Sequence, residues 1–353
     1  MKKAIMILMI TSMTSAIFAE GSVSGVSYFS YSMKKINTDL GVDERGFELN
    51  RVYLTYNNEI SDKVSFQFQA DMQNTNKTEE TAYYMYIKKA QLDLKVANGA
   101  KLIIGMQGMN MFNVAEKNWG NRFLRKTAMD MNKWSASADL GVGVELSMGC
   151  PFIESNKIYG SLLVTNGEGY KSTSSDNYEK ISFQAMYGEN RLDKKDGFNI
   201  GTVYSTLKYA NDQREDTSTE TVMGIFTGFA GFGLRAGLEY HMGTDFNNEY
   251  EVSDSGKNYQ ISYGSSSTLM SFYANYSLSF IDGLSLFGRY DMVDLGNEDY
   301  SHPYVSTMMA GLVYNCTEGL IVAPHIVQNK VDPNDDDEGI ENYEFHLSFQ
   351  FKF

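Results

Sequence analysis

The residues of this chain that could do chemistry gather in one segment, positions 108–136. This segment has two acidic residues and five basic ones: Lys117, Arg122, Arg125, Lys126 and Lys133. Each of the other long polar connectors is neutral or acidic, and the whole chain has a net charge of −14. Fixed positive charge in a narrow, low-dielectric passage attracts anions and repels cations. The segment therefore predicts an ion filter in a passage, the alternative being an external loop whose cations bridge to lipopolysaccharide phosphates.

Catalytic and metal-binding chemistry has less support in the sequence. The four histidines, at positions 241, 302, 325 and 346, show no metal-ligand spacing, and none lies in a recognisable Ser/His motif. The acidic stretch 332–339 does not match the spacing of a calcium loop and predicts a solvated face. We therefore expect no catalytic residue, no metal and no cofactor. The acidic net charge excludes a nucleic-acid binder.

The elements that must position the basic segment are predicted to be β-strands. A composition of 24 Tyr, 21 Phe and 31 Gly against 4 Pro favours strands and tight turns. Apolar and polar residues alternate repeatedly, most clearly over Val64–Met72, which in a strand places all apolar side chains on one face. Sixteen segments show this pattern: 22–33, 46–57, 62–73, 83–96, 100–107, 137–147, 156–166, 178–189, 197–209, 219–229, 232–242, 267–280, 283–292, 304–315, 319–329 and 342–353.

The connectors between these segments sort by length. They are short after most even-numbered segments and mostly long and polar after odd-numbered ones, which is typical of outer-membrane barrels. Beyond position 19, no apolar run approaches the length of a transmembrane helix. We predict an all-β transmembrane antiparallel barrel of sixteen strands, formed by residues 20–353 as a single domain. The basic segment 108–136 is expected to fold inward as a constriction loop.

The two ends of the chain carry signals for export and assembly. Residues 1–19 combine a Lys2-Lys3 pair, a short apolar run and a final Ala19, which predicts a secretory signal peptide. The last segment alternates aromatic and polar residues and stops at Phe353, similar to the signal read by the barrel-assembly machinery. The predicted location is the bacterial outer membrane, with its lipid and lipopolysaccharide as the surroundings.

The predicted barrel interior is too wide for side chains to fill, so an aqueous lumen is favoured. Trp119 and Trp134 are expected to anchor the basic segment, and Pro324 to cause a bulge or a local break in its strand. Cys150 and Cys316 fall on opposite walls, which predicts no disulfide. Phasing the strands by their apolar rows places four basic side chains on the lumen wall: Lys89, Lys101, Arg235 and Arg289.

Two stretches, Gly46–Met72 and Lys89–Lys126, resemble the phosphate-selective porins of the O and P type. The resemblance covers about a third of the chain. It implies a sixteen-stranded, usually trimeric, passive pore. Where relatives show a Gly-x-x-x-x-Pro-Phe pattern, this chain has Gly108–Phe112 without a proline, and it has no evident dense row of lysines. The resemblance therefore supports a porin and leaves its solute open.

Three classes of function follow from these patterns. The first is a non-enzymatic outer-membrane porin: a passive channel for small polar solutes or ions, assembled as a homotrimer and preferring anions slightly. The second is a structural or adhesive barrel without significant transport. The third is an outer-membrane hydrolase, which would need a nucleophile and base from different strands.

Overall fold

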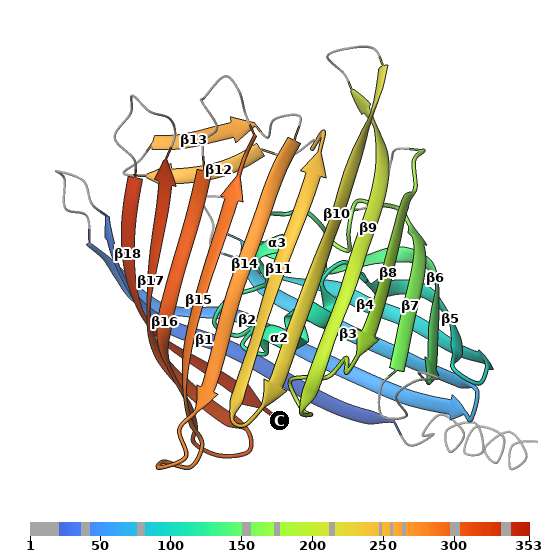
Figure 1. Ribbon diagram of the computed structural model, residues 1–353, viewed down its shortest axis with the longest axis horizontal. Helices are drawn as coiled ribbons and strands as arrows, with labels where there is room; N and C mark the ends of the chain where they lie inside the picture. Colours follow the sequence, from blue (N-terminus) through green and yellow to red (C-terminus); the bar gives the residue numbers. More distant parts are fainter. Residues whose placement is uncertain are drawn as a thin grey trace, which may run out of the picture.

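The computed structural model describes residues 21–36, 43–75, 82–149, 157–172, 177–211, 216–246, 249–254, 257–262, 266–296, 304–332 and 340–353 (Figure 1). The expected signal peptide 1–19, Cys150 and the acidic residues 333–339 lie outside this part of the chain. Cys316 is an exposed free cysteine.

Sixteen antiparallel strands form a closed barrel, which confirms the fold predicted from the alternation of residues. All sixteen predicted segments are strands of the barrel, and observed ends differ from predicted ones by a few residues. The barrel strands are β1 (Ser22–Ile36), β2 (Asp43–Ser61), β3 (Val64–Thr75), β4 (Ala82–Ala97), β5 (Ala100–Gly108), β6 (Ala138–Gly149), β7 (Lys157–Thr165), β8 (Lys180–Gly188), β9 (Gly197–Asn211), β10 (Asp216–Gly231), β11 (Leu234–Thr244), β14 (Ser266–Ser277), β15 (Leu284–Asp294), β16 (Tyr304–Asn315), β17 (Leu320–Asp332) and β18 (Ile340–Lys352).

The first and last strands close the ring. β1 pairs with β18 from Val26 opposite Lys352 to Ile36 opposite Asn342. Gly25 N–H donates to the Phe353 carbonyl at 2.7 Å, and Phe353 N–H donates back at 3.0 Å. The barrel therefore has no open edge along this seam.

Strand β6 shows how the sequence sets the two faces of the wall. Its apolar residues Leu140, Val142, Val144, Leu146 and Met148 alternate with Asp139, Glu145 and small residues. All five apolar side chains are exposed on the outside of the barrel, whereas Asp139 is buried inside. An apolar outer face and a polar inner face are what a strand in a membrane barrel requires.

The alternation pattern predicted every strand of the barrel but missed one separate two-stranded sheet. Strands β12 (Glu249–Asp254) and β13 (Lys257–Ser262) pair only with each other, within a connector predicted to be a loop. Figure 1 shows this hairpin above the barrel. Within the residues that the structure describes, no helix is long and apolar enough to cross a membrane.

Strand β17 runs through Pro324 without a change of register. Pro324 lies opposite Leu347 of β18. On the other side, the ladder with β16 passes from the Gly311–His325 pair to the Tyr314–Val322 pair in the same register. Of the two expected outcomes, a bulge or a local break, the structure shows the second. Only a local break in one ladder accompanies the proline, which has no N–H to donate.

The lumen contains two apolar clusters between the segment 109–137 and the inner wall. One cluster includes Met111, Met129 and Trp134 with inward residues of β9, β10 and β14–β17. The other joins Trp119 and Phe123 to inward residues of β14–β17. Trp119 and Trp134 are both completely buried, which confirms that they anchor this segment. Because the first cluster also includes Met186 of β8, the side of the lumen beside β8–β17 is packed with side chains.

Candidate functional site

The segment between β5 and β6 forms two short helices inside the barrel (Figure 1). Helix α2 (Asn113–Trp119) ends at Gly120, whose φ of 71° is the left-handed conformation that terminates many helices. Helix α3 (Ala128–Met131) begins after Thr127, whose hydroxyl accepts a hydrogen bond from the Asp130 N–H at 3.4 Å. These two ends set the path of the segment across the lumen.

Amide side chains attach this segment to β7, β8, β9 and β14. Asn110 donates to the Ser161 hydroxyl at 2.9 Å, and Gln184 donates to the Asn110 carbonyl at 2.6 Å. Asn118 forms a pair with Asn199 of β9. Asn121 donates to Asn275 of β14. Because these bonds join neutral groups, salt does not screen them as it screens ion pairs between exposed charges.

Trp119 is the central anchor of the inward segment, and two of the predicted lumen-wall residues contact it. The Arg289 guanidinium lies 5.0 Å from the Trp119 ring centroid, in cation–π geometry. Arg289 also forms a two-pronged ion pair with Asp291 at 2.8 Å. Arg235 donates to the Trp119 carbonyl at 3.2 Å. Both arginines therefore contact the inward segment at Trp119.

Arg125 lies on the same side as these anchors. It donates to the Thr307 hydroxyl at 3.2 Å and lies 3.9 Å from the Asp291 carboxylate. Its backbone carbonyl accepts a hydrogen bond from the Trp119 indole at 2.9 Å. Lys133 is exposed, with a φ of 60°. The structure thus places Arg125 against β15 and β16.

Arg122 and Lys126 pair with the two acidic residues of their own segment. Arg122 contacts Glu116 and lies 3.0 Å from Asp130, and Lys126 lies 3.1 Å from the other Asp130 oxygen. Burial opposes the charge of Arg122, but Glu116, Tyr53 and Asp130 outweigh it and hold its pKa well above the usual value. Burial likewise opposes the Asp130 charge, but Lys126 and Arg122 lower its pKa. The surplus charge counted in the sequence is thus partly neutralised within the segment.

Three cations converge on the Tyr53 hydroxyl of β2. Arg51 donates to it at 2.9 Å, Lys88 at 3.3 Å and Arg122 at 3.4 Å. Arg122 therefore connects the inward segment to the opposite wall of the barrel. Arg51 also lies 3.3 Å from Asp71 of β3, so one carboxylate faces this group of cations.

Lys88 faces the lumen because β4 contains a bulge. The pairing with β3 shifts register between Gln69 opposite Lys89 and Ala70 opposite Ile87, so Lys88 has no partner in the ladder. A bulge places two successive side chains on one face. Lys88 reaches Tyr53, while Lys89 interacts electrostatically with Lys88 and with Lys117 of α2. Two adjacent lysines thus enter the lumen together.

A loop after β7 adds a further cation. Tyr170 donates to Asp71 at 2.7 Å, and the Lys171 ammonium lies 5.5 Å from the Tyr86 ring centroid. Burial, together with the nearby Lys126 and Arg51, lowers the pKa of Lys171 to about 8. Lys171 is therefore close to the inward segment although 45 residues separate it from Lys126 in sequence.

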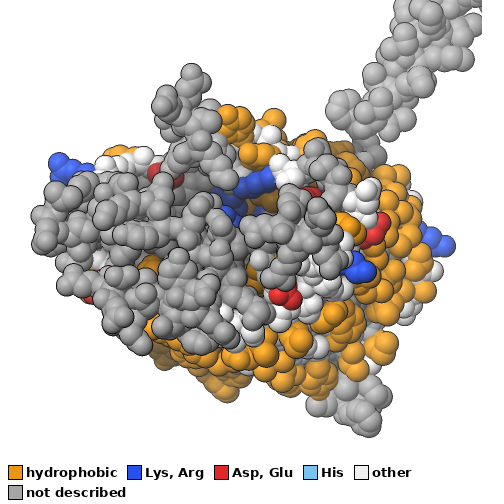
Figure 2. All heavy atoms as spheres, turned by 90° about the horizontal axis from the view of Figure 1, so that it is seen from above, with side chains coloured by type: hydrophobic (Ala, Val, Ile, Leu, Met, Phe, Trp, Pro, Cys, Tyr) orange, Lys and Arg blue, Asp and Glu red, His pale blue; other side chains and the backbone are white. Residues whose placement is uncertain are grey.

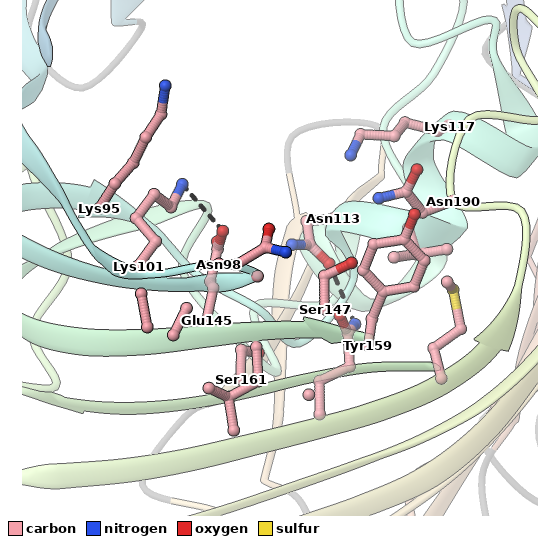
Figure 3. A pocket seen from close by; sticks show the side chains of 18 residues that line it. Lys95, Asn98, Lys101, Asn113, Lys117, Glu145, Ser147, Tyr159, Ser161 and Asn190 are labelled. Carbon is pink, nitrogen blue, oxygen red and sulfur yellow. Dashed lines mark hydrogen bonds and ion pairs between the residues drawn. The ribbon is translucent and has the colours of Figure 1, made fainter. Parts of the chain in front are cut away.

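Lys101 and Lys117 continue this series toward the short turns. Lys101 lies 3.1 Å from Asp93 and 2.8 Å from Glu145. Lys117 projects from α2 into a cavity of about 590 Å³ that Lys101 also lines (Figure 3). Burial lowers the pKa of Lys117, and Arg191 adds to this effect.

We refer to these cations together as the basic path. Figure 2 shows Lys and Arg side chains in the hollow of the barrel as seen from above. The structure brings together five predicted residues with three that the sequence reading did not select. The basic path consists of Arg51, Lys88, Lys89, Lys101, Lys117, Arg122, Lys126 and Lys171.

Comparison with known proteins gives structural neighbours only. No family model and no curated protein matches the chain. Three similar solved structures are an anion-selective porin from Comamonas acidovorans (10% identity, TM-score 0.62, 95% of this chain and 100% of that chain), the outer membrane channel DcaP of Acinetobacter baumannii (12%, 0.59, 95% and 98%) and OprB of Pseudomonas putida (10%, 0.62, 97% and 96%). At these identities the likeness establishes the barrel fold.

Proposed function

We propose that the chain is an outer-membrane porin, a passive diffusion channel for small hydrophilic solutes or ions with a slight preference for anions. The observation that carries this proposal is the basic path, whose cations lie along the inward segment and on β2, β4 and β5. The porin folds of the structural neighbours support the same conclusion.

The balance of charges along the basic path favours anions. Each carboxylate named beside it already has a partner: Asp71 bonds Arg51 and Tyr170, Asp130 bonds Arg122 and Lys126, and Glu145 bonds Lys101. Lys88, Lys89, Lys117 and Lys171 have no carboxylate partner in an ion pair among the described residues. Unpaired positive charge in a narrow passage lowers the barrier for an anion more than for a cation.

Location and assembly belong to the same proposal. Residues 1–19 would direct export, and the barrel-assembly machinery would insert the mature chain beside lipid and lipopolysaccharide as a homotrimer. The sequence resemblance to phosphate-selective porins makes phosphate the first anion to test. The porin proposal includes no enzymatic activity. Among the described residues, Glu239–His241 and Glu344–His346 pair a histidine with a carboxylate, and no serine hydroxyl bonds either imidazole.

A structural barrel is the second candidate, and one observation favours it. Arg122 reaches Tyr53 on the opposite wall, so the inward segment spans the lumen. A barrel that its own segment closes would conduct little.

Planar-bilayer recording of the purified protein separates the two candidates. The porin proposal expects stable channels and a reversal potential on the anion side under a potassium chloride gradient. The absence of any current would favour the structural barrel. A reversal potential on the cation side would agree with the porin function but contradict the anion preference.

A further inference from the structure

A cavity of about 590 Å³ lies in the barrel between α2 and the short turns (Figure 3). The turn at Asn98, the ends of β5 and β6, and Asn190 between β8 and β9 line it, together with Asn113 and Lys117 of α2. Sites for small molecules usually enclose about 300–1,000 Å³. The cavity is thus much larger than a chloride or phosphate ion requires.

Two lysines at this cavity have no ion-pair partner among the described residues. Glu145, the one carboxylate of the lining, is already bonded to Lys101 at 2.8 Å. Lys95 and Lys117 lie on opposite sides of the cavity in Figure 3. Lys117 is half-buried and Lys95 is exposed. Removing the Lys117 ammonium from water without a counter-charge is costly, and an anionic ligand that reaches it from the side of Lys95 would restore the lost interactions.

Apart from the Lys101–Glu145 ion pair, the polar groups around the cavity are neutral and form hydrogen bonds. Gln184 donates to Asn113 Oδ1 at 3.0 Å, which fixes the orientation of that amide and leaves its NH₂ group for a ligand. Asn98, Asn190 and Ser147 lie around the same space. Amides and hydroxyls both donate and accept, so they match the hydroxyl groups of a polyol.

We propose that this cavity binds a small polyhydroxylated anion, a sugar acid or a sugar phosphate, with its charged group between Lys95 and Lys117. The site would be the inner vestibule of the channel, and the inference rests on the proposed porin function. An inorganic anion leaves most of the cavity unused, and a neutral sugar leaves both lysines without a counter-charge. A cation meets no free carboxylate in this lining.

Titration calorimetry on the detergent-solubilised protein tests binding independently of conduction. Glucuronate and glucose 6-phosphate serve as probes. The controls are glucose, which has the hydroxyl groups without the charge, and acetate, which has the charge without the hydroxyl groups. We expect both polyhydroxylated anions to bind at least about tenfold more tightly than glucose or acetate, because each control lacks one set of contacts. Stronger binding of glucuronate or of glucose 6-phosphate identifies the preferred acid group.

Lysine variants locate the site. Lys95→Gln and Lys117→Gln should each weaken glucuronate binding by about tenfold, the effect of losing one charge-assisted hydrogen bond. Lys63→Gln is the matched control, because Lys63 is exposed in the β2–β3 turn on the same rim and does not line the cavity. Heat-modified migration in gels reports that each barrel is folded, and Lys95→Gln, at an exposed position, keeps the test valid if Lys117→Gln does not fold.

Current recordings then distinguish the two proposals. Glucuronate added on the side of the short turns should interrupt the current more than the same concentration added on the other side. Equal binding of glucuronate and glucose, or binding that neither lysine variant weakens, would overturn the inference while the porin function stands. A protein that binds glucuronate at this site but conducts no ions would overturn the porin function instead.

Discussion

The side-chain amides of Asn118 and Asn199 donate to each other, both at 2.9 Å, and both side chains are completely buried. Asn118 belongs to α2 and Asn199 to β9, so this pair fixes the inward segment to the wall. A buried amide that loses its partner must remain desolvated without hydrogen bonds, at a cost of about 1–3 kcal/mol.

Asn199→Ala should therefore loosen α2. We expect a lower unfolding temperature and noisier open-channel current than in the parent protein. In the double variant Asn118→Ala/Asn199→Ala, the loss of stability should be smaller than the sum of the two single losses, because no unpaired amide remains. Thermal unfolding followed by circular dichroism measures both effects. Additive losses would show that the pair is not coupled.

The close approach of α2 to β10 gives a second prediction. A Cβ at Gly228 would lie 2.5 Å from Asn118 Nδ2, so Gly228→Ala must displace the amide or the helix. We expect a change in single-channel conductance. Gly46→Ala is the matched control in another strand, since a Cβ at Gly46 meets nothing within 4 Å. An unchanged conductance in Gly228→Ala would mean that α2 does not border the current path.

The pKa of Lys171 predicts a dependence of selectivity on pH. Burial and the neighbouring cations Lys126 and Arg51 lower this pKa to about 8, so the side chain is charged below that pH and loses its charge above it. Anion preference should therefore fall as the pH rises from about 7 to about 9, whereas an ordinary lysine would remain charged over this interval. Reversal potentials at both pH values measure the change. Lys171→Gln should lower the preference at neutral pH and abolish the pH step, and Lys63→Gln should do neither.

The position of each cation around the inward segment predicts how strongly it contributes to ion selectivity. Replacing Lys88 and Lys89 together with Gln should shift the reversal potential toward cations, because both side chains enter the lumen on the open side. Arg125→Gln should shift it less, because Arg125 lies on the packed side with Asp291 and Thr307. A larger effect of Arg125→Gln would place the ion path on the other side of the segment.

Replacing Arg122, Arg125 and Lys126 together with Gln tests the segment itself. We expect a shift toward cations, because Asp130 and Glu116 then lose their counter-charges. Current should remain measurable, since the strands of the barrel are unchanged. If the triple variant keeps the ion preference of the parent protein, the wall lysines alone set selectivity.

The barrel could be predicted from the sequence because each of its strands must separate an apolar face from a polar one. β12 and β13 pair only with each other and have six residues each, so length and membrane-facing periodicity do not mark them. Strict alternation also predicts correctly that Lys89 and Lys101 face the lumen. The same rule is wrong for Lys88, because it places Lys88 on the outer face and only the bulge brings it inward.

The pairing of charges could not be predicted from composition. Counting residues in 108–136 indicates a positive segment, but whether Arg122 is free or bonded to Glu116 and Asp130 depends on how the chain folds inside the lumen. Arg235 and Arg289 have the correct periodicity for the lumen wall. Their role as supports of Trp119 follows from the inward segment packing over them, which no local pattern reveals.

The two apolar clusters displace the passage through the barrel from the barrel axis. Because side chains of β8–β17 and of the segment 109–137 fill one side, an ion that crosses the barrel would travel off-axis, beside β2–β7. A reporter group attached to a cysteine at the partly exposed Gln69 would stand in the current, whereas one at the buried Val305 would be enclosed in packed protein. For use as a sensing nanopore, engineering should therefore concentrate on one wall, and the opposite wall is best left unchanged as mechanical support.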